Sequence, residues 1–232
     1  MPCEDAGQAI MLASLGMRRS AAGDRFALIG MGDQGQLTRV CARQMGSSMV
    51  YCSLEGRPAA PGQLDLPTQA SLEREGRLVL GLLGHPVIHS VSKPMQEAAL
   101  RSAGLTGVYL NLDVPPAALT GDALDTLRRL GLSGLNVTVP HKEKVRAMCD
   151  ELAPEAESAG AVNTVVFGRK KVYGKNTDVI GFITAIEQKT EIGPDTEALI
   201  VGAGGAARAA AVGLGRAGAH VTVAARDRAK GE

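Results

Sequence analysis

The chain has 232 residues, and 45% of them are hydrophobic, so it can bury the core of one large domain or of two ordinary ones. Its formal net charge of +1 gives no electrostatic argument for binding to nucleic acid or to a membrane surface. Three Tyr, three Phe and no Trp among 29 Gly are typical of an aliphatic α/β protein.

No apolar run approaches the roughly 18 residues of a membrane-spanning helix. The first ten residues carry Glu4 and Asp5 where a secretory signal would be basic and then apolar. The four cysteines, at positions 3, 41, 52 and 149, form no C-x-x-C pair and have no histidine at metal-ligand spacing. We therefore predict free thiols, no bound metal and a soluble cytoplasmic protein.

The first third of the chain alternates helical and strand-like stretches. We expect a helix over residues 5–22 with Ile10, Leu12 and Leu15 inward, a strand over 25–30, a Gly-rich turn over 31–35, a helix through Leu37, Val40 and Cys41, a strand over 49–52 and a Pro-rich loop over 54–69. By itself, this α-β-α-β order fits a small piece of any α/β fold.

Several short motifs lie within this stretch: Met31-Gly32, Gly35, Thr38-Arg39, Gly46-Ser47 and Ala60-Pro61-Gly62-Gln63. Together they resemble the final βαβ portion of type I 3-dehydroquinate dehydratase, a (β/α)8 barrel. The resemblance implies that Arg39 meets the substrate carboxylate and that Gln63 lies on a loop over the site. The family's Schiff-base lysine and its histidine partner belong to earlier barrel strands. We therefore expect a partial barrel with open strand edges and no dehydratase activity.

After a charged connector over residues 71–77, the pattern becomes that of an open, mostly parallel sheet with helices. We expect strands over residues 78–84, 108–112, 135–139, 160–167 and 171–174, the last two as a hairpin, and helices over 95–103, 115–130 and 142–152, with another through Gly181-Phe182. The helix at 115–130 should direct Leu119, Leu124, Leu127 and Leu130 inward.

A lysine follows one of these strands. Apolar and polar residues alternate over 135–139, and Pro140 ends the strand because it offers no backbone N–H. Lys142 therefore lies just past a strand's carboxyl end, where open α/β sheets bind their ligands. A lysine there can donate or accept a proton if a neighbouring carboxylate and partial burial tune it. The alternative is an ordinary solvated helix start.

Two serines lie between the strand at 78–84 and the helix that follows it. The hydroxyls of Ser90 and Ser92, together with helix N–H groups, can hold an anion such as a carboxylate. Simple capping of the helix N-terminus is the alternative.

Four motifs follow one another along this part of the chain: His-Ser-x-Ser at 89–92, Asn-Val-Thr-Val-Pro-His-Lys at 136–142, Gly-Ala-Val-Asn-Thr at 160–164 and Asn-Thr-Asp-x-x-Gly at 176–181. In order and spacing they resemble shikimate dehydrogenase, over about residues 78–230. The resemblance implies that the substrate-binding residues are Ser90, Ser92, Thr138, Lys142, Asn163 and Asp178.

The implied roles divide along chemical lines. The two serines would hold the shikimate carboxylate, while Thr138, Asn163 and Asp178 would bind its hydroxyls. Lys142, with Asp178 beside it, would exchange the proton at the reacting oxygen, because hydride reduction of a ketone leaves an alkoxide that needs an acid within reach. Lys93 departs from the family's usual Pro and Gln96-Glu97 from its His-Asn, but neither removes a group from the motifs.

A dinucleotide-binding pattern begins near residue 198. Strands are expected over 198–201 and 220–225, with a helix ending at Ala217 between them. The sequence Gly202-Ala203-Gly204-Gly205-Ala206-Ala207 fits G-x-G-x-x-G/A in that strand-to-helix context. Gly202 permits the tight turn and Gly204 lets a pyrophosphate approach the backbone. The predicted cofactor contacts here are Gly202, Ala203, Gly204, Gly205 and Ala206.

The end of the second of these strands indicates which cofactor is bound. Arg226 stands where an NAD enzyme usually has an acid, and with Lys230 it suits the 2′-phosphate of NADP. Ala225 and Asp227, which we also predict as contacts, depart from the Asn-Arg-Thr/Ser pattern of the resembled family. Two solvated basic residues are the alternative, and the glycine loop favours NADP.

We expect three domains: the dehydratase-like piece over 1–70, the substrate-binding domain over 76–195 and a truncated NADP-binding Rossmann domain over 196–232. The implied activity is reversible NADPH-dependent reduction of 3-dehydroshikimate to shikimate, in aromatic amino-acid (chorismate) biosynthesis. The chain would be a fragment of a bifunctional dehydratase–dehydrogenase, inactive by itself. A non-catalytic quinate- or shikimate-sensing regulator and an inactive gene fragment are the alternatives. The expected partner is the small-molecule substrate, with a homodimer left open.

Overall fold

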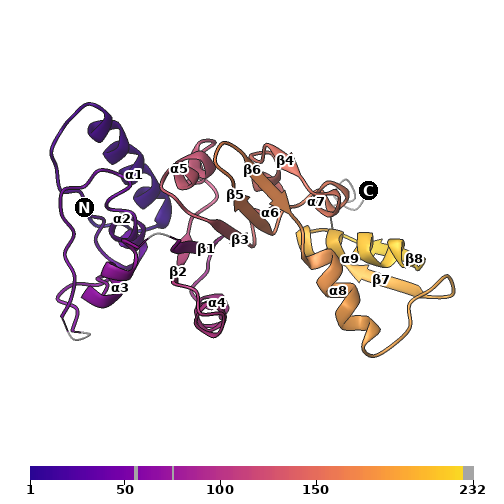
Figure 1. Ribbon diagram of the computed structural model, residues 1–232. Helices are drawn as coiled ribbons and strands as arrows, with labels where there is room; N and C mark the ends of the chain where they lie inside the picture. Colours follow the sequence, from indigo (N-terminus) through magenta and orange to yellow (C-terminus); the bar gives the residue numbers. More distant parts are fainter. Residues whose placement is uncertain (55–56, 75, 227–232) are drawn as a thin grey trace. The chain divides into compact units, whose positions relative to one another are not determined.

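A computed structural model describes the chain except for residues 55–56, 75 and 227–232 (Figure 1). The chain forms two compact units. Unit 1 comprises Met1–Thr138 and Phe167–Lys170, and unit 2 comprises Val139–Val166 and Lys171–Glu232. Among the described residues, no helix has the length and apolar character needed to cross a membrane.

The N-terminal part of unit 1 is helix and loop. Its elements are α1 (Ala6–Ala21), the 3-10 turn η1 (Asp33–Gly35), α2 (Gln36–Val40) and α3 (Leu66–Ser71). Asp5 caps α1 by accepting a hydrogen bond from the backbone N–H of Gln8 at 3.0 Å, which satisfies one free donor of the first turn. The predicted helix over 5–22 is confirmed and buries Ile10, but Leu15 is 40% exposed and does not point inward as expected.

The two strands expected over residues 25–30 and 49–52 are wrong. In the described part of residues 1–77, extended pairing is limited to isolated bridges, such as the one between Pro2 and Met31. A barrel strand is stable only when neighbouring strands satisfy its N–H and C=O groups on both edges. The expected loop over 54–69 also ends early, because Asp65 caps α3 through the N–H of Thr68 at 2.7 Å.

The centre of unit 1 is a parallel sheet with the order β2-β1-β3, formed by β1 (Leu78–Gly84), β2 (Gly107–Asp113) and β3 (Gly134–Val137). The continuously apolar β1 lies between the other two and is almost entirely buried, as its composition predicts. Helix α4 (Ser92–Ser102) connects β1 to β2, and α5 (Ala123–Arg129) precedes β3.

Three boundaries in this sheet region differ from the prediction. α4 begins at Ser92 because Pro94 falls in the first turn, where the missing N–H leaves no helical bond unmade. α5 begins at Ala123, after two turns, although Leu119, Leu124, Leu127 and Leu130 are all buried as expected. β3 ends at Val137, so Val139 is outside the strand and 68% exposed.

The first part of unit 2 contains short strands and helices. Its strands are β4 (Glu151–Leu152), β5 (Thr164–Phe167, whose last residue belongs to unit 1) and β6 (Val172–Lys175), in the order β5-β6-β4. The short connection between β5 and β6 agrees with the expected hairpin. Its helices are α6 (Lys142–Arg146), α7 (Pro154–Ala159) and α8 (Asp178–Glu187).

The single helix expected over 142–152 is wrong beyond Arg146. Asp150 pairs with Val172 of β6 through backbone and carboxylate bonds at 2.9 and 2.7 Å, so the chain leaves the helix to form β4. The short α7 was not predicted, although Pro154 at its start and Gly160 at its end, with φ of +61°, are the residues that favour those positions.

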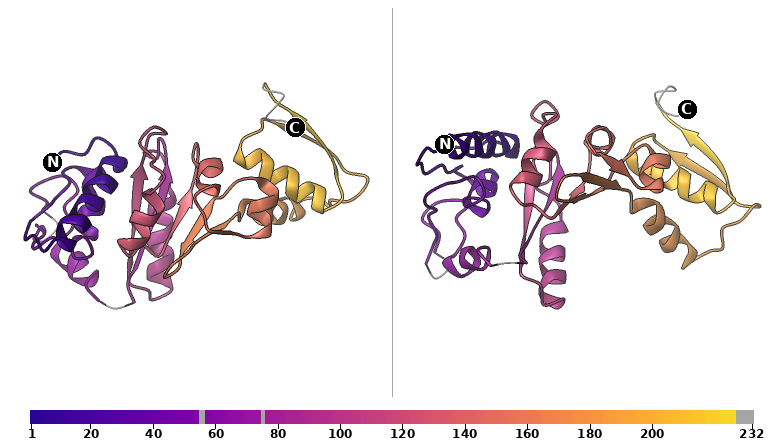
Figure 2. Two further views of the ribbon diagram at one scale, coloured as in Figure 1. Left: turned by 90° about the horizontal axis from the view of Figure 1, so that it is seen from above. Right: turned by 45° about the horizontal axis from the view of Figure 1, so that its top comes forward.

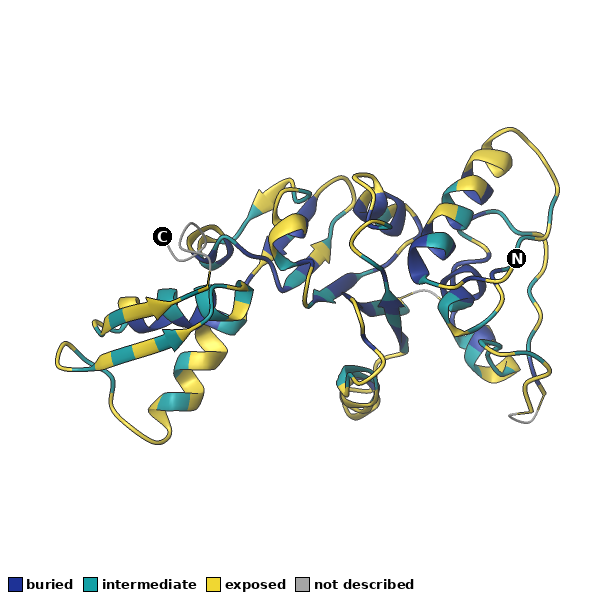
Figure 3. Cartoon of the chain, turned by 180° about the vertical axis from the view of Figure 1, so that it is seen from behind, coloured by how far each residue is buried: buried dark blue, intermediate teal, exposed yellow. Residues whose placement is uncertain are grey.

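The last elements form one parallel β-α-β unit, as predicted: β7 (Glu197–Val201), α9 (Gly205–Arg216) and β8 (His220–Ala224). α9 packs beside α8 (Figures 1 and 2), and a Cβ on Gly213 would lie 2.7 Å from Ile183, so only glycine permits this approach. The strands are largely exposed (Figure 3), with Leu199 at 67% and Val201 at 82%.

The four cysteines are free thiols, as predicted. Burial raises the pKa of Cys41 to about 12 and that of Cys149 to about 11, so both remain protonated at neutral pH. Neither can act as a thiolate nucleophile under those conditions.

The central position of β1 yields a stability prediction. Leu83 is fully buried in β1, so Leu83→Ala should lower the free energy of unfolding by about 2–5 kcal/mol through lost burial and a residual cavity. Leu105→Ala, at a position that is 50% exposed, is the matched control and should cost less than about 1 kcal/mol. Urea unfolding of both variants measures the difference, and equal losses would show that β1 is not the core strand.

Candidate active site

Lys142 forms an ion pair in unit 2. It is the first residue of α6, follows the buried His141, and its carbonyl accepts a hydrogen bond from the N–H of Val162 at 2.9 Å. Its side chain is 14% exposed, and Nζ donates to Oδ2 of Asp178 at 2.5 Å. A lysine whose ammonium is held at a short distance from a carboxylate has a fixed direction.

Two hydrogen bonds hold Asp178 in addition to its ion pair with Lys142. Its Oδ1 accepts from Nδ2 of Asn163 at 2.7 Å, and its backbone N–H donates to Oδ1 of Asn176 at 3.0 Å. Because Asp178 is also the first residue of α8, the helix N-terminus favours its negative charge. The carboxylate is therefore positioned before any ligand arrives.

Asn163 is 8% exposed, and its amide group is fully engaged within the protein. Nδ2 donates to Asp178 and to Oγ1 of Thr177, while Oδ1 accepts from Thr164 and from the N–H of Thr177, all at 2.7–2.9 Å. Its first role in this structure is thus to position Asp178 and Thr177. A substrate hydroxyl would have to replace one of these bonds, and that contact stays a prediction.

Asn176 is a structural member of this group to which the sequence argument gave no role. It is 2% exposed, and its Nδ2 donates to the carbonyl of Ala161 at 2.9 Å while its Oδ1 accepts from Asp178. It therefore ties the motif at 160–164 to the motif at 176–181. An amide side chain two residues before the acid was the available signal, since such a residue must find partners once it is buried.

The glycine loop has the geometry expected of a dinucleotide site. Gly202 adopts φ of +113°, and Gly204 is the N-cap of α9. A Cβ at either glycine would meet nothing within 4 Å, so the backbone is open to a close ligand. A cavity of about 440 Å³ lies here, lined by Glu143, Val201, Gly202, Ala203, Gly204, Ala224, Ala225 and Arg226.

Most of the predicted cofactor contacts therefore gather at one cavity. Gly202, Ala203, Gly204, Ala225 and Arg226 line it, and Gly205 and Ala206 open the helix whose free N–H groups can hold a phosphate. The residues present fit a dinucleotide. The remaining two predicted contacts, Asp227 and Lys230, lie outside the described residues.

The glycine loop and the lysine are in direct contact within unit 2. A Cβ on Gly205 would lie 2.9 Å from Cδ of Lys142, so α9 begins against the lysine's aliphatic stem. Gly202 and Gly204 were predicted to let a ligand approach the backbone. That position 205 must be glycine to leave room for the stem of Lys142 was not predicted. The side chain of Lys142 and the glycine loop thus lie next to each other.

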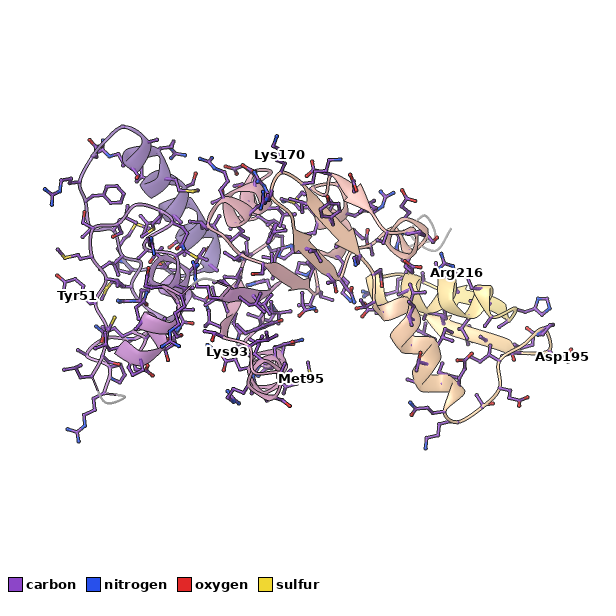
Figure 4. All side chains as sticks on the ribbon, in the orientation of Figure 1. Tyr51, Lys93, Met95, Lys170, Asp195 and Arg216 are labelled. Atoms are coloured by element: carbon purple, nitrogen blue, oxygen red, sulfur yellow. The ribbon has the colours of Figure 1, made fainter. Side chains whose placement is uncertain are left out.

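Two further residues of this neighbourhood were not predicted. Glu143, next to the lysine, lines the cavity, and Arg208 lies 3.9 Å from its Oε1. Nε of Arg208 also donates to the carbonyl of Ala203 in the glycine loop at 3.3 Å. Figure 4 shows Arg216 further along the same helix, where it pairs with Glu155 at 3.5 Å.

The serine pair lies in unit 1, at the start of α4. Oγ of Ser90 donates to Oγ of Ser92 at 3.0 Å and accepts from the N–H of Ser92 at 3.2 Å. The N-cap position is Val91, without a side-chain cap, so the hydroxyl bonds run between the serines and not in the usual capping pattern. Thr138 follows β3, and its N–H donates to the carbonyl of Leu83 at 2.9 Å.

Lys93, the departure from the family pattern, projects from the first turn of α4 (Figure 4). Its Nζ donates to Oε1 of Gln36 in α2 at 3.5 Å. The lysine thus contacts the dehydratase-like part of unit 1, and the two serine hydroxyls remain paired beside it.

The two residues predicted for the dehydratase-like piece have internal contacts. Arg39 is 2% exposed, and burial lowers its pKa. In the described part of the chain, its guanidinium contacts the carbonyl of Tyr51 at 3.4 Å and Sδ of Met31 at 3.7 Å. Oε1 of Gln63 accepts from the N–H groups of Ala59 and Ala60 and so shapes its own loop. Within the described residues, no cluster of three His, Cys, Asp or Glu could hold a metal.

The fold and site together define an α/β protein with a Rossmann-type β-α-β unit. Comparison with protein families is more specific: residues 82–165 match the shikimate dehydrogenase substrate binding domain, and residues 8–71 match type I 3-dehydroquinase. Both resemblances predicted from the motifs are confirmed.

Relatives and solved structures agree with these matches. The chain is 51% identical over 148 residues to shikimate dehydrogenase (NADP(+)) of Methanopyrus kandleri, which is 63% of this chain and 51% of that protein. The crystal structure of shikimate dehydrogenase from Aquifex aeolicus superimposes with a TM-score of 0.63 at 38% identity, covering 68% of this chain and 59% of that one. For the Thermus thermophilus enzyme, in complex with NADP(H) and shikimate, the TM-score is 0.60 at 42% identity, covering 66% and 58%. The chain spans about half the length of the relatives it matches.

The network around Asp178 yields a second stability prediction. Asn176→Ala should lower the free energy of unfolding by about 1–3 kcal/mol, because it leaves the carbonyl of Ala161 without its side-chain donor and the N–H of Asp178 without its acceptor. Gln188→Ala, at an exposed position just after α8, is the control and should change it by less than about 0.5 kcal/mol. Chemical unfolding monitored by far-UV circular dichroism compares them, and a neutral Asn176→Ala would contradict the assigned role.

Proposed function

We propose that this chain is part of an NADP-dependent shikimate dehydrogenase. That enzyme catalyses the reversible reduction of 3-dehydroshikimate to shikimate in aromatic amino-acid (chorismate) biosynthesis. One observation carries the proposal. The ammonium of Lys142 is held 2.5 Å from Asp178, and the stem of the same lysine packs on Gly205 of the dinucleotide loop. A proton donor beside a dinucleotide loop is what hydride reduction of a ketone requires.

In the proposed chemistry, NADPH supplies the hydride when bound. Lys142 donates a proton to the oxygen that becomes the new hydroxyl, and in the oxidation direction it accepts that proton. Asp178 keeps the ammonium aimed, because its two oxygens are held in place, one by Lys142 and one by Asn163. The low exposure of Lys142 strengthens its interaction with developing negative charge.

We propose separate contacts for the carboxylate and for the ring hydroxyls of the substrate. The hydroxyls of Ser90 and Ser92 hold the substrate carboxylate, and Thr138, Asn163 and Asp178 contact its ring hydroxyls. This is supported by the paired serine hydroxyls at the start of α4 and by the identity to shikimate dehydrogenases over this region.

The proposed cofactor is NADP. The glycine loop and the start of α9 would hold its phosphates, and the exposed Arg226 at the rim of the cavity would contact the 2′-phosphate. We also propose three domains, with boundaries near residues 70–76 and 195, and a cytoplasmic location, and the homodimer stays an open alternative to a monomer.

The competing function is a non-catalytic quinate- or shikimate-sensing regulator. A sensor needs groups that hold the carboxylate, but it has no use for a proton donor. The organised ion pair of Lys142 with Asp178 therefore favours the enzyme, as do relatives named shikimate dehydrogenase (NADP(+)). The same observation disfavours an inactive gene fragment.

The role of Lys142 is tested by Lys142→Met in the protein expressed from its complete gene. Turnover of shikimate with NADP should fall by about 10²-fold or more, because the proton-transfer group is lost while a side chain of similar length remains. NADP affinity should stay within a factor of about two to three. Lys144→Met, on the exposed side of the same helix, is the matched control and should keep parental turnover. Turnover of the Lys142 variant within a few-fold of the parent would refute the assignment.

Cofactor choice is tested by Arg226→Ala in the same protein. Loss of a charge-assisted contact should weaken NADP(H) binding by about 1.5–3 kcal/mol and leave NAD(H) binding nearly unchanged. Titration calorimetry with each cofactor measures both values. An equal loss for NADP(H) and NAD(H) would mean that Arg226 supports the fold of the loop and does not select the phosphate.

A further inference from the structure

A tyrosine that no motif includes lies beneath the serine pair of unit 1. Tyr109 belongs to β2 (Figure 1). It is 1% exposed and packs against Leu82, Val87 and Leu80, so its ring is part of the core. Its hydroxyl is not buried without partners. It donates to Oδ1 of Asn136, on β3, at 2.8 Å, and it also interacts with the hydroxyl of Ser92.

These contacts form one continuous chain of polar groups. Ser90 donates to Ser92, the hydroxyl of Ser92 meets the phenol oxygen of Tyr109, and Tyr109 donates to Asn136. A phenol has one proton to give and can accept another, so Tyr109 can serve both neighbours at once. All four residues lie in unit 1, on α4, on the loop before it and on two strands of one sheet.

The bond to Asn136 fixes which end of that amide a ligand can meet. Because Oδ1 accepts from Tyr109, the Nδ2 donors of Asn136 must point away from the phenol. Thr138 lies two residues further along, on the same face of the extended chain, which is where β3 ends. An anion at this place would thus meet the amide donors of Asn136 and not the amide oxygen, which would repel it, whereas each serine proton would have to leave its present acceptor to reach the anion.

We infer that Tyr109 is a positioning residue for recognition of the substrate carboxylate, acting by holding Oδ1 of Asn136 so that the Nδ2 donors of this amide face the ligand. The inference rests on the proposed function for the assignment of the serine pair to that carboxylate. Burial raises the pKa of Tyr109 to about 12, with the hydrogen bond from Ser92 opposing the rise, so the phenol is neutral throughout the usual assay range. It therefore adds no negative charge beside the anion.

The test separates an effect on the carboxylate from an effect on folding. The protein expressed from its complete gene is titrated with shikimate and with shikimate methyl ester, which keeps the ring hydroxyls but carries no charge. Tyr109→Phe keeps the buried ring and removes only the hydroxyl. It should weaken shikimate binding about 10-fold and change binding of the ester less than about twofold. Tyr173→Phe, on β6, is the control and should change neither.

A double variant and a second single variant complete the experiment. In an Asn136→Ala background, Tyr109→Phe should add less than about twofold, because the amide through which it acts is gone. Asn136→Asp keeps an acceptor for Tyr109 but removes the donors, so it should weaken shikimate binding by more than about 10-fold and spare the ester. It also provides the readout if Tyr109→Phe does not fold.

The possible results are distinct. Equal losses for shikimate and its ester in both single variants would make Tyr109 and Asn136 merely structural and overturn the inference. Unchanged binding of shikimate in both would overturn it as well, while the proposed function would stand. If the parent protein binds neither compound, the proposed function fails and the inference fails with it.

Discussion

The ion pair between Lys142 and Asp178 is the interaction on which the rest of the site depends. Each partner is the first residue of a short helix, so the pair can form only if both helices start in the right place. Removing two charges from water is costly, and such a pair gives little net stability unless other hydrogen bonds satisfy its remaining atoms. Asn163 supplies such a bond to the second carboxylate oxygen of Asp178, and Asn176 accepts from the backbone N–H of the same residue.

This requirement explains the local architecture of unit 2. The bond from Asn176 to the carbonyl of Ala161 holds the segment after β6 against the segment before β5, so Asn163 and Asp178 can meet. Gly205 then allows α9 to begin against the stem of Lys142. Gly205 and the amides of Asn163 and Asn176 thus hold Lys142 and Asp178 in position. The observed contacts favour a rigid proton-transfer group over a mobile surface lysine.

Periodicity and composition predicted the sheet well because burial on one or both faces leaves a direct mark on sequence. The apolar β1 and the β-α-β unit at 197–224 were found with boundaries within one residue. The strands at 25–30 and 49–52 were wrong for the same reason, since a buried apolar run looks alike whether or not neighbours exist to pair with it. Pattern alone indicated an acid or base at Lys142, but the partner Asp178 came from the resemblance to shikimate dehydrogenase.

Some contacts were not predicted because they involve a residue that fits the apolar pattern of a strand but also has a polar group. Tyr109 fits an ordinary strand pattern and is indeed part of the core, yet its hydroxyl joins Ser92 to Asn136. The polar groups of unit 1 are neutral donors that can bind a carboxylate without taking up or releasing a proton, whereas those of unit 2 are an ion pair that can transfer one. In the proposed enzyme, recognition and proton transfer thus belong to different groups, because neutral hydroxyls and amides hold an anion without exchanging a proton with it.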